Sequence, residues 1–306
     1  MDRIETMGLF VAIADAGSLA GAARRLRLPV QSVSRKLQAL EDHLGARLLT
    51  RTTRRLALTE EGRHYVEACR RILADVEEAE QGVAGRHDEP RGALAVTAPV
   101  VFGRLHVLPA LMAFLGAFRG VQARLVLVDR VVDLVEEGID VAVRIGALQD
   151  SSLIALRVGV LRRVICASPA YLADRGVPAR PQDLADHDCI TFAGISSTDR
   201  WHFRDEGREL SVPVRSRLVV TTAEAAVDAA VAGLGVVRLL SYQVAAAIAV
   251  GRLRLILQPF DPSEVPVHLV SVETRFAPAR VRAFLDFAAP RLRARLQALG
   301  ESPAFG

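Results

Sequence analysis

Five polar side chains that could read nucleic acid lie close together near the N-terminus. They are two amides, two hydroxyls and one guanidinium, on Gln31, Ser32, Ser34, Arg35 and Gln38. Side chains of these types hydrogen-bond to base edges in a DNA major groove, and arginine also binds phosphate. Except for Ser32, their spacing places them on one side of a helix. An ordinary solvated helix face would have the same pattern, so both interpretations remain open here.

A basic segment follows this polar set. Residues 47–58 are rich in threonine and arginine, which predicts a two-stranded hairpin. In such a hairpin Arg51, Arg54 and Arg55 would lie near phosphates and supply affinity that is independent of sequence and sensitive to salt. A basic hairpin directly after a DNA-reading helix is a wing.

The charge of the chain is unevenly distributed. Residues 1–65 carry eleven basic and seven acidic side chains, whereas the remaining residues carry twenty-eight of each, so the whole net charge of +4 lies in the first fifth. Such asymmetry indicates a polyanionic partner for the N-terminal region.

Three short helices are expected to position the polar set. Apolar spacing predicts a helix over residues 4–16 that ends at Gly17, and Ser18 is placed to cap a second helix with a small-residue face. Pro29 fits the first turn of a third helix, which Gly45 would end. The apolar side of that helix comprises Val33, Leu37, Leu40 and Leu44. The module is therefore predicted to be a winged helix-turn-helix.

A long helix capped by Thr59 should follow the wing. Six apolar residues recur in it with alternating spacings of four and three, which is a heptad seam: Tyr65, Cys69, Ile72, Val76, Ala79 and Val83. We expect this seam to pair two copies of the chain, although the helix could instead pack on its own C-terminal domain. Glycine and proline among charged residues 82–92 predict a hinge.

From residue 93 onward, short apolar runs alternate with helical patterns. This alternation predicts an α/β domain of two lobes with a mostly parallel sheet. The predicted strands are 93–98, 123–128, 140–144, 164–167, 217–220, 236–239 and 267–272, and the predicted helices are 104–118, 131–137, 169–175, 223–232 and 278–299. The expected division is 1–59 for the DNA-binding domain, 60–91 for the linker helix and hinge, and 92–306 for the sensor domain. Within the sensor domain, lobe I covers about 92–162 and 268–306, and lobe II about 163–267.

Motifs along nearly the whole chain resemble the LysR-type regulator family. The motifs are Ser18–Leu26, Gln31–Leu37, Leu40-Glu41, Leu44-Gly45, Arg47–Leu49, Arg51 and Leu58–Gly62, then Val96–Pro99, Phe102-Gly103, Leu108-Pro109, Asp140–Gly146, Ala167–Leu172 and Ala232–Gly235. The resemblance implies that Ser34 and Arg35 contact DNA, that the linker helices pair into dimers or tetramers, and that the C-terminal domain is periplasmic-binding-protein-like. Pro29-Val30 departs from the family, which usually has Ser-Gln at this point.

The resemblance and the strand pattern together predict a ligand site in the C-terminal domain. Ligands of open α/β sheets bind beyond the carboxyl ends of the strands. The residues expected there are Thr97, Ala98, Pro99, Arg144, Ile145, Phe192 and Thr222. Arg144 could pair with an anionic effector, or it could be a buried structural arginine. Phe192 could line the pocket or belong to the core.

Other classes of protein are disfavoured by what the sequence lacks. There is no Gly-x-Ser-x-Gly elbow, no phosphate-binding glycine loop and no metal-ligand spacing of its seven histidines, so we expect no enzyme, cofactor or metal site. Cys69, Cys166 and Cys189 are far apart, which suits a reducing cytoplasm. The apolar stretch 105–118 falls short of the ~20 residues that span a bilayer, and no export signal is expected.

The sequence therefore predicts a cytoplasmic, effector-controlled transcriptional regulator. The expected partners are double-stranded DNA, a small-molecule effector and a second copy of the chain in a homodimer or homotetramer, with RNA polymerase as a further candidate and no membrane. A purely architectural DNA-binding protein is the main alternative, and an enzyme built on the two-lobed fold is the other.

Overall fold

The structure is a computed structural model that describes residues 2–51, 56–83, 89–148, 153–193, 200–205, 207–260, 264–272 and 278–301. The side chains of residues 51, 75, 77–79 and 81–83 are not described. The chain divides into two compact units, Met1–Ala93 and Leu94–Gly306.

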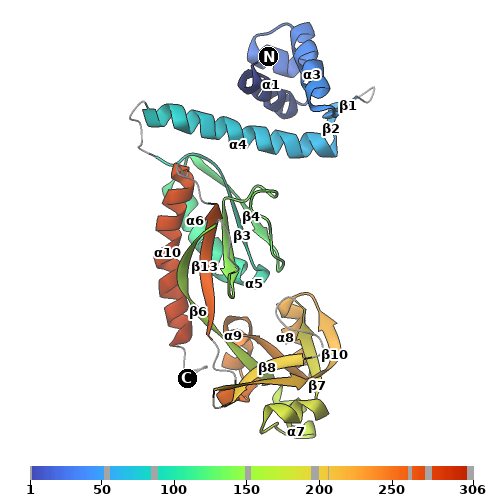
Figure 1. Cartoon of the computed structure of the whole chain (residues 1–306), viewed down its shortest axis with the longest axis vertical. Helices are drawn as coiled ribbons and strands as arrows, with labels where there is room; N and C mark the ends of the chain where they lie inside the picture. The colour runs from blue at the N-terminus through green and yellow to red at the C-terminus, as the bar shows by residue number, and fades with distance from the viewer. Residues whose placement is uncertain are drawn as a thin grey trace. The chain divides into compact units, whose positions relative to one another are not determined.

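The first unit is a helical module with a short hairpin and a long final helix (Figure 1). Its elements are α1 (Arg3–Ala16), α2 (Leu19–Leu26), α3 (Val30–Leu44), β1 (Leu49–Arg51), β2 (Leu56–Leu58) and α4 (Glu60–Val83). The predicted local signals are confirmed: the Ser18 hydroxyl accepts from the Gly21 amide at 3.0 Å, and Gly45 ends α3 with φ 65°. The Thr59 hydroxyl likewise accepts from the Gly62 amide at 2.9 Å and caps α4. Pro29 precedes α3 and makes no side-chain cap.

Two close approaches hold the hairpin against the helices. The buried Glu41 carboxylate of α3 accepts from the amides of Leu48 and Leu49, at 2.8 and 3.2 Å. At Gly62 of α4, a Cβ atom would lie 2.0 Å from the Leu48 carbonyl oxygen, so only glycine fits there. The start of the hairpin is thus fixed by both α3 and α4.

The second unit is built on one large twisted sheet. Its strands lie in the order β10, β7, β11, β6, β13, β5, β3, β4, and β12 pairs with β6. Their bounds are β3 (Gly92–Ala98), β4 (Val121–Leu127), β5 (Val141–Ile145), β6 (Leu153–Ala167), β7 (Asp188–Phe192), β10 (Arg215–Val220), β11 (Val236–Leu240), β12 (Arg254–Ile256) and β13 (Glu264–Val272). A separate hairpin is formed by β8 (Arg200–Asp205) and β9 (Arg208–Pro213).

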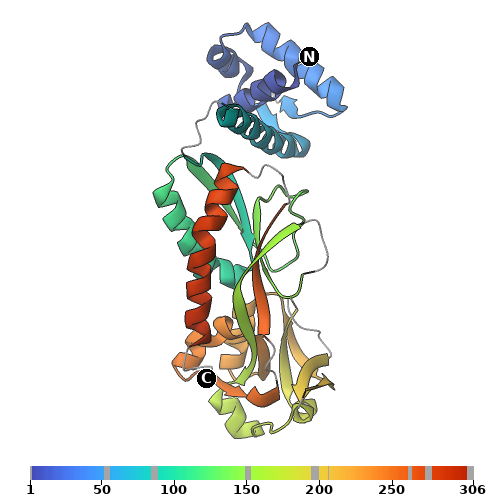
Figure 2. The same cartoon turned by 60° about the vertical axis from the view of Figure 1, so that its left-hand side comes forward.

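Helices pack against this sheet, and the longest, α10, lies along the long strands β6 and β13 (Figures 1 and 2). The helices are α5 (Val100–Phe102), a π-helical turn η1 (Gly103–Val107), α6 (Leu108–Ala117), α7 (Pro169–Arg175), α8 (Ala223–Val231), α9 (Ser241–Ala249) and α10 (Ala279–Gly300), with 3-10 turns at Pro181–Asp186 and Gln258–Phe260. The apolar core contains Phe102, Phe114 and Phe284.

The prediction of a mostly parallel sheet was wrong. The two strands that cross between the lobes, β6 and β13, run antiparallel to their neighbours. Strand β6 pairs with β13 as far as Arg162 and with β11 from Arg163 onward. Strand β13 is antiparallel to both β5 and β6. Parallel pairing remains between β3 and β5 and between β7 and its neighbours β10 and β11.

The helix predicted over 131–137 was also wrong. This segment contains only a turn over 134–138, in which the Asp133 carboxylate accepts from the amides of Val135 and Glu136, both at 2.9 Å. Gly138 then takes a left-handed φ of 61°, which ends the turn before a helix can extend. The sequence prediction missed β7, β8, β9, β12, α9 and most of β6.

Among the described residues, one helical stretch, Val100–Ala117, has the length and composition of a membrane span. Length and composition alone do not separate a span from a core helix. In this stretch Phe102, Leu111 and Phe114 are buried within the core of the second unit.

Candidate nucleic-acid interface and ligand pocket

The outward face of α3 carries most of the predicted DNA-binding residues. An open groove on this face is lined by Gln31, Ser34, Arg35, Gln38, Ala39 and Asp42. Of the predicted set, Ser32 does not line this groove and is half-buried. Gln38 donates to the Asp42 carboxylate at 2.8 Å, which fixes its amide along the helix.

The inward face of α3 is apolar. Val33, Leu37 and Leu40 are buried in the core of the first unit, where Ala22 and Ala23 of α2 pack closely. Lys36 forms an ion pair with Glu5 of α1, so this cation is used within the module. The helix therefore presents one polar face to its surroundings and uses the other to hold its position.

The wing is described in part. Strands β1 and β2 form the predicted antiparallel hairpin, with Leu49 opposite Leu58. Arg51 lies in β1, although its side chain is not described, and Arg54 and Arg55 lie outside the described residues.

The predicted dimerisation seam on α4 splits into two parts. Tyr65 packs on Phe10 of α1, with ring centroids 5.7 Å apart, and Cys69 is completely buried in the same core. Cys69 therefore stabilises the protomer itself, whereas Tyr65 is half-buried and stays a predicted seam residue. Burial also raises the pKa of the Cys69 thiol.

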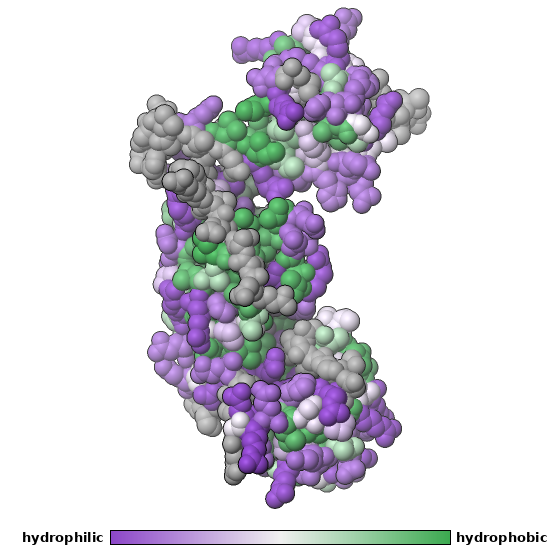
Figure 3. Space-filling view, in the orientation of Figure 1, coloured by the Kyte–Doolittle hydropathy of each residue, from purple (hydrophilic) through white to green (hydrophobic). Residues whose placement is uncertain are grey.

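The next part of the seam remains exposed. Ile72 is 41% exposed and Val76 is half-buried, whereas the side chains of Ala79 and Val83 are not described. Figure 3 shows an apolar patch over α4. The half-buried Leu73, which sequence reasoning missed, lies beside Ile72 on this helix.

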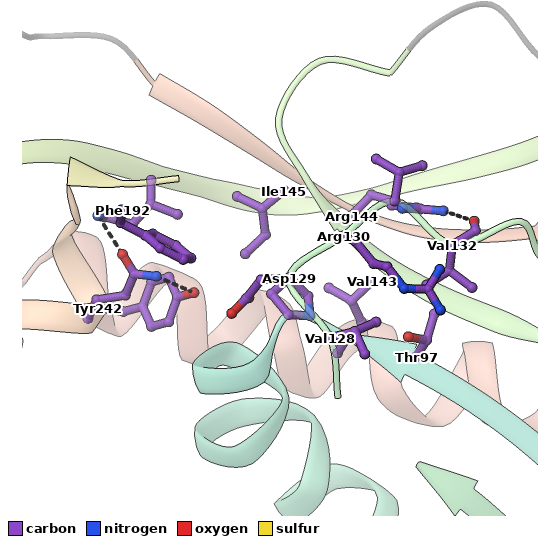
Figure 4. A pocket seen from close by; sticks show the side chains of 15 residues that line it. Thr97, Val128, Asp129, Arg130, Val132, Val143, Arg144, Ile145, Phe192 and Tyr242 are labelled. Carbon is purple, nitrogen blue, oxygen red and sulfur yellow. Dashed lines mark hydrogen bonds between the residues drawn. The ribbon is translucent and has the colours of Figure 1, made fainter. Parts of the chain in front are cut away.

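The second unit contains a cavity of about 140 Å³ between its two lobes. Six of the seven predicted ligand residues line it: Thr97, Ala98, Pro99, Arg144, Ile145 and Phe192. Thr222 does not line it, and its hydroxyl caps α8 by accepting from the Ala225 amide at 3.4 Å. Phe192, which is 1% exposed, and Tyr242 reach the cavity from lobe II (Figure 4).

Arg144 is turned away from the lobe II wall. Its guanidinium donates to the Val132 carbonyl, on the side of the cavity opposite Phe192 and Tyr242 (Figure 4). Burial lowers the pKa of this guanidinium from its usual value.

Asp129 is a lining residue that sequence reasoning missed. Its carboxylate accepts from the Val100 amide at 3.1 Å, at the start of the helical run Val100–Ala117. Burial is the main cause that raises the pKa of Asp129, and the charge of Glu224 acts in the same direction. Asp129 closely follows β4, so the rule that places ligands beyond strand ends would have found it.

Tyr242 and Gln243 complete the polar lining on lobe II. The Gln243 amide donates to the Tyr242 hydroxyl at 3.4 Å, and its carbonyl oxygen accepts from the Leu240 amide at 2.9 Å. Burial raises the pKa of the Tyr242 hydroxyl above its usual range. Among the described residues, no group of three or more metal-ligating side chains is found.

Two family models match the chain. A model described as bacterial regulatory helix-turn-helix protein, lysR family, matches residues 4–63, and one described as LysR substrate binding domain matches residues 87–293. The chain is a LysR-type transcriptional regulator. It therefore binds DNA through its helix-turn-helix and carries an effector-binding domain.

Curated relatives and a solved structure agree with this membership. The regulator is 35% identical to an HTH-type transcriptional regulator of Xanthomonas campestris, covering 93% of this chain and 84% of that protein. It is 34% identical to an HTH-type transcriptional repressor of Pseudomonas aeruginosa, covering 94% and 91%. CrgA, a LysR-type transcriptional regulator of Neisseria meningitidis, superposes with a TM-score of 0.60 at 31% identity, covering 94% and 98%. Such relatives are regulators of transcription, which favours regulation over an enzymatic role.

Proposed function

We propose that this regulator acts in the cytoplasm as a homodimer or homotetramer that reads an operator through α3 and responds to a small ligand held between its lobes. The division of α3 into two faces carries the proposal. Its buried side fixes the helix, while Gln31, Ser34, Arg35 and Gln38 share one open groove. Arg35 is exposed and makes no hydrogen bond or ion pair with any described residue, so its donors are available to DNA.

Replacement of Arg35 tests the reading helix. Arg35→Ala should weaken operator binding by roughly tenfold or more, since one base or phosphate contact of arginine contributes about 1–3 kcal/mol. Arg3→Ala, which removes an exposed arginine from α1 of the same module, serves as the matched control. A gel shift by Arg35→Ala equal to that of the wild type, in protein with an unchanged melting curve, would refute this role.

A footprint identifies the operator. The protein would be tested on the DNA that flanks its own gene, at ~150 mM salt with excess competitor, because non-specific binding weakens steeply with salt. Protection of an interrupted inverted repeat with half-sites about 34 Å apart is expected for a two-fold dimer. The wing residues Arg51, Arg54 and Arg55 are proposed to contact flanking phosphates, so their substitution should reduce the salt dependence of binding. Diffuse coating of the DNA would favour the architectural alternative.

Pairing through α4 is the second structural part of the proposal. It is supported by the exposed Ile72, which lies beside half-buried Leu73 and Val76 on one helix. Ile72→Asp should convert the assembly to monomers in sedimentation, because a carboxylate would be buried at the seam without a partner. Arg71→Asp, a change to the same residue type at the adjacent position, is the control. Monomers in the wild type at micromolar concentration would reject the pairing.

The interlobe cavity is the proposed effector site. Its lining from both lobes means that a bound ligand stabilises one relative position of the lobes, which is how a ligand shifts a population. The change in the pairing partner of β6 after Arg162 supports lobe I at about 92–162 and 268–306 and lobe II at 163–267. RNA polymerase is the candidate downstream partner when the regulator activates.

A further inference from the structure

The charged group that faces the lobe II wall of the cavity is acidic. Figure 4 shows the Asp129 carboxylate turned toward Tyr242, whereas the guanidinium of Arg144 points the other way. Arg144 donates instead to the Val132 carbonyl. Of Asp129 and Arg144, it is therefore the carboxylate that faces lobe II across the cavity.

The other cation of the lining is already paired. Arg130 forms a two-point contact with Glu137, with nitrogen–oxygen distances of 2.7 and 2.9 Å. This geometry is the strong fork-like pairing of guanidinium with carboxylate. Arg130 therefore does not neutralise Asp129.

An anion would be poorly placed beside this wall. The first amide of the helical run Val100–Ala117 could attract an anion, but the Asp129 carboxylate already occupies it through its bond to Val100. An anionic ligand next to Asp129 would meet a like charge in a partly desolvated site. The charge of Glu224 also raises the pKa of Asp129, although Glu224 itself pairs with Arg104 at 3.9 Å.

The rest of this wall suits a cation with an apolar body. Phe192 and Tyr242 supply aromatic rings, and Ile145 lies opposite them (Figure 4). Aromatic rings attract ammonium and guanidinium groups, more strongly when water is excluded. The Tyr242 hydroxyl and the Gln243 amide add neutral hydrogen-bonding groups.

We propose that the effector carries a protonated amine or guanidinium group that pairs with Asp129 beside Phe192 and Tyr242. This inference rests on the proposed function, because it concerns the ligand of the same cavity. It replaces the expectation of an anionic effector held by Arg144 with a cationic one held by Asp129.

The test compares two probes of similar shape and opposite charge. Phenethylamine and 3-phenylpropionate would be titrated against the full-length protein, with binding followed by saturation-transfer NMR. We expect the amine to bind more tightly, and Asp129→Asn to weaken it at least about tenfold. This substitution keeps an oxygen that accepts from the Val100 amide, so the helix start is retained. Asp133→Asn, which alters a backbone-capping carboxylate that does not line the cavity, is the matched control.

A cavity-filling variant separates the two levels of the proposal. Ile145→Trp should abolish binding of any ligand held in the cavity. If the carboxylate probe binds and is lost in Ile145→Trp, the cavity is the ligand site but the cationic assignment is overturned. If amine binding persists in Ile145→Trp, the cavity is not the binding site. The proposed effector site and the proposed pairing of a cation with Asp129 then both fail. Amine binding that is undetectable, or unchanged in Asp129→Asn, also overturns the inference.

Discussion

Acidification should destabilise the effector domain through one buried histidine. His106, in the π-helical turn η1, is 6% exposed, and neither ring nitrogen has a hydrogen-bond partner among the described residues. Its ring packs against Phe102 and Tyr242, with centroids 4.8 and 5.7 Å away. Burial, with a smaller contribution from the charge of Arg295, lowers the pKa of His106 to about 4.

The sign and size of the effect follow from linkage. The unfolded chain, in which the pKa of His106 is 6.5, binds a proton more readily than the folded chain. Stability is therefore lost as pH falls from 6.5 toward 4. A group with these two pKa values loses about 2 kcal/mol between pH 7.5 and pH 5. In a domain of this size that loss corresponds to a fall in Tm of about 4–8 °C.

The assay uses the only tryptophan of the chain. Trp201 is buried in the second unit, so its fluorescence follows unfolding of the effector domain and not of the DNA-binding module. The fall in Tm between pH 7.5 and pH 5 should be about 4–8 °C smaller in His106→Phe than in the wild type. Burial also lowers the pKa of His187 and His268, so only this difference between variants isolates His106.

The control replaces a histidine of the other unit. His64→Gln alters an exposed residue of α4 and should leave the Trp201 transition unchanged at both pH values. Equal pH dependence in His106→Phe and the wild type would refute the assignment. His106→Leu provides a second test if phenylalanine disturbs the ring cluster.

The DNA-binding module allows two further tests by circular dichroism and gel shift. Gly62→Ala should lower the stability of the module by roughly 1–3 kcal/mol, because the new methyl group would collide with the Leu48 carbonyl. The control is Gly116→Ala at an exposed position of α6. An unchanged melting curve for Gly62→Ala would contradict the argument. Glu41→Ala should cost about 1–3 kcal/mol for each of the two amides left without an acceptor; Glu41→Gln, which keeps an oxygen, should recover much of the loss, and equal loss in both variants would contradict it.

The N-terminal module was predictable because its signals are local. Ser18 and Thr59 each cap a helix with a hydroxyl three residues before the amide they bind, and Gly45 ends α3 in the left-handed region. Such signals act within a few residues and do not depend on the rest of the fold. Helix bounds in this module therefore agree closely with the sequence prediction.

The long strand β6 could not be found in the same way. Its residues 154–157 are all exposed, so the alternation that marks a half-buried strand is absent there. The strand is held by pairing with β13 about a hundred residues later in the chain, and then with β11. Pairing over such sequence distances leaves little local pattern.

The seam on α4 shows a different limit. A heptad pattern predicts which side of a helix is buried. It does not specify whether that side packs against the same chain or against a second chain. Phe10 of α1 covers Tyr65, and the module's own core buries Cys69. Ile72, about one turn later, is exposed in the protomer, and this is where the proposed contact with a second chain would begin.

The charge of the ligand pocket depends on side-chain direction, which sequence position does not specify. Arg144 and Asp129 both lie near strand ends at the same cavity. The rule that ligands bind beyond strand ends therefore predicts either residue equally well as a ligand contact. The structure separates them, because the Val132 carbonyl draws the guanidinium of Arg144 to one side while the Val100 amide holds Asp129 at the helix start. Each is fixed by a backbone group from another segment of the chain, so the acid faces the lobe II wall and the base does not. The sign of the charge that faces the lobe II wall is therefore set by these two backbone contacts.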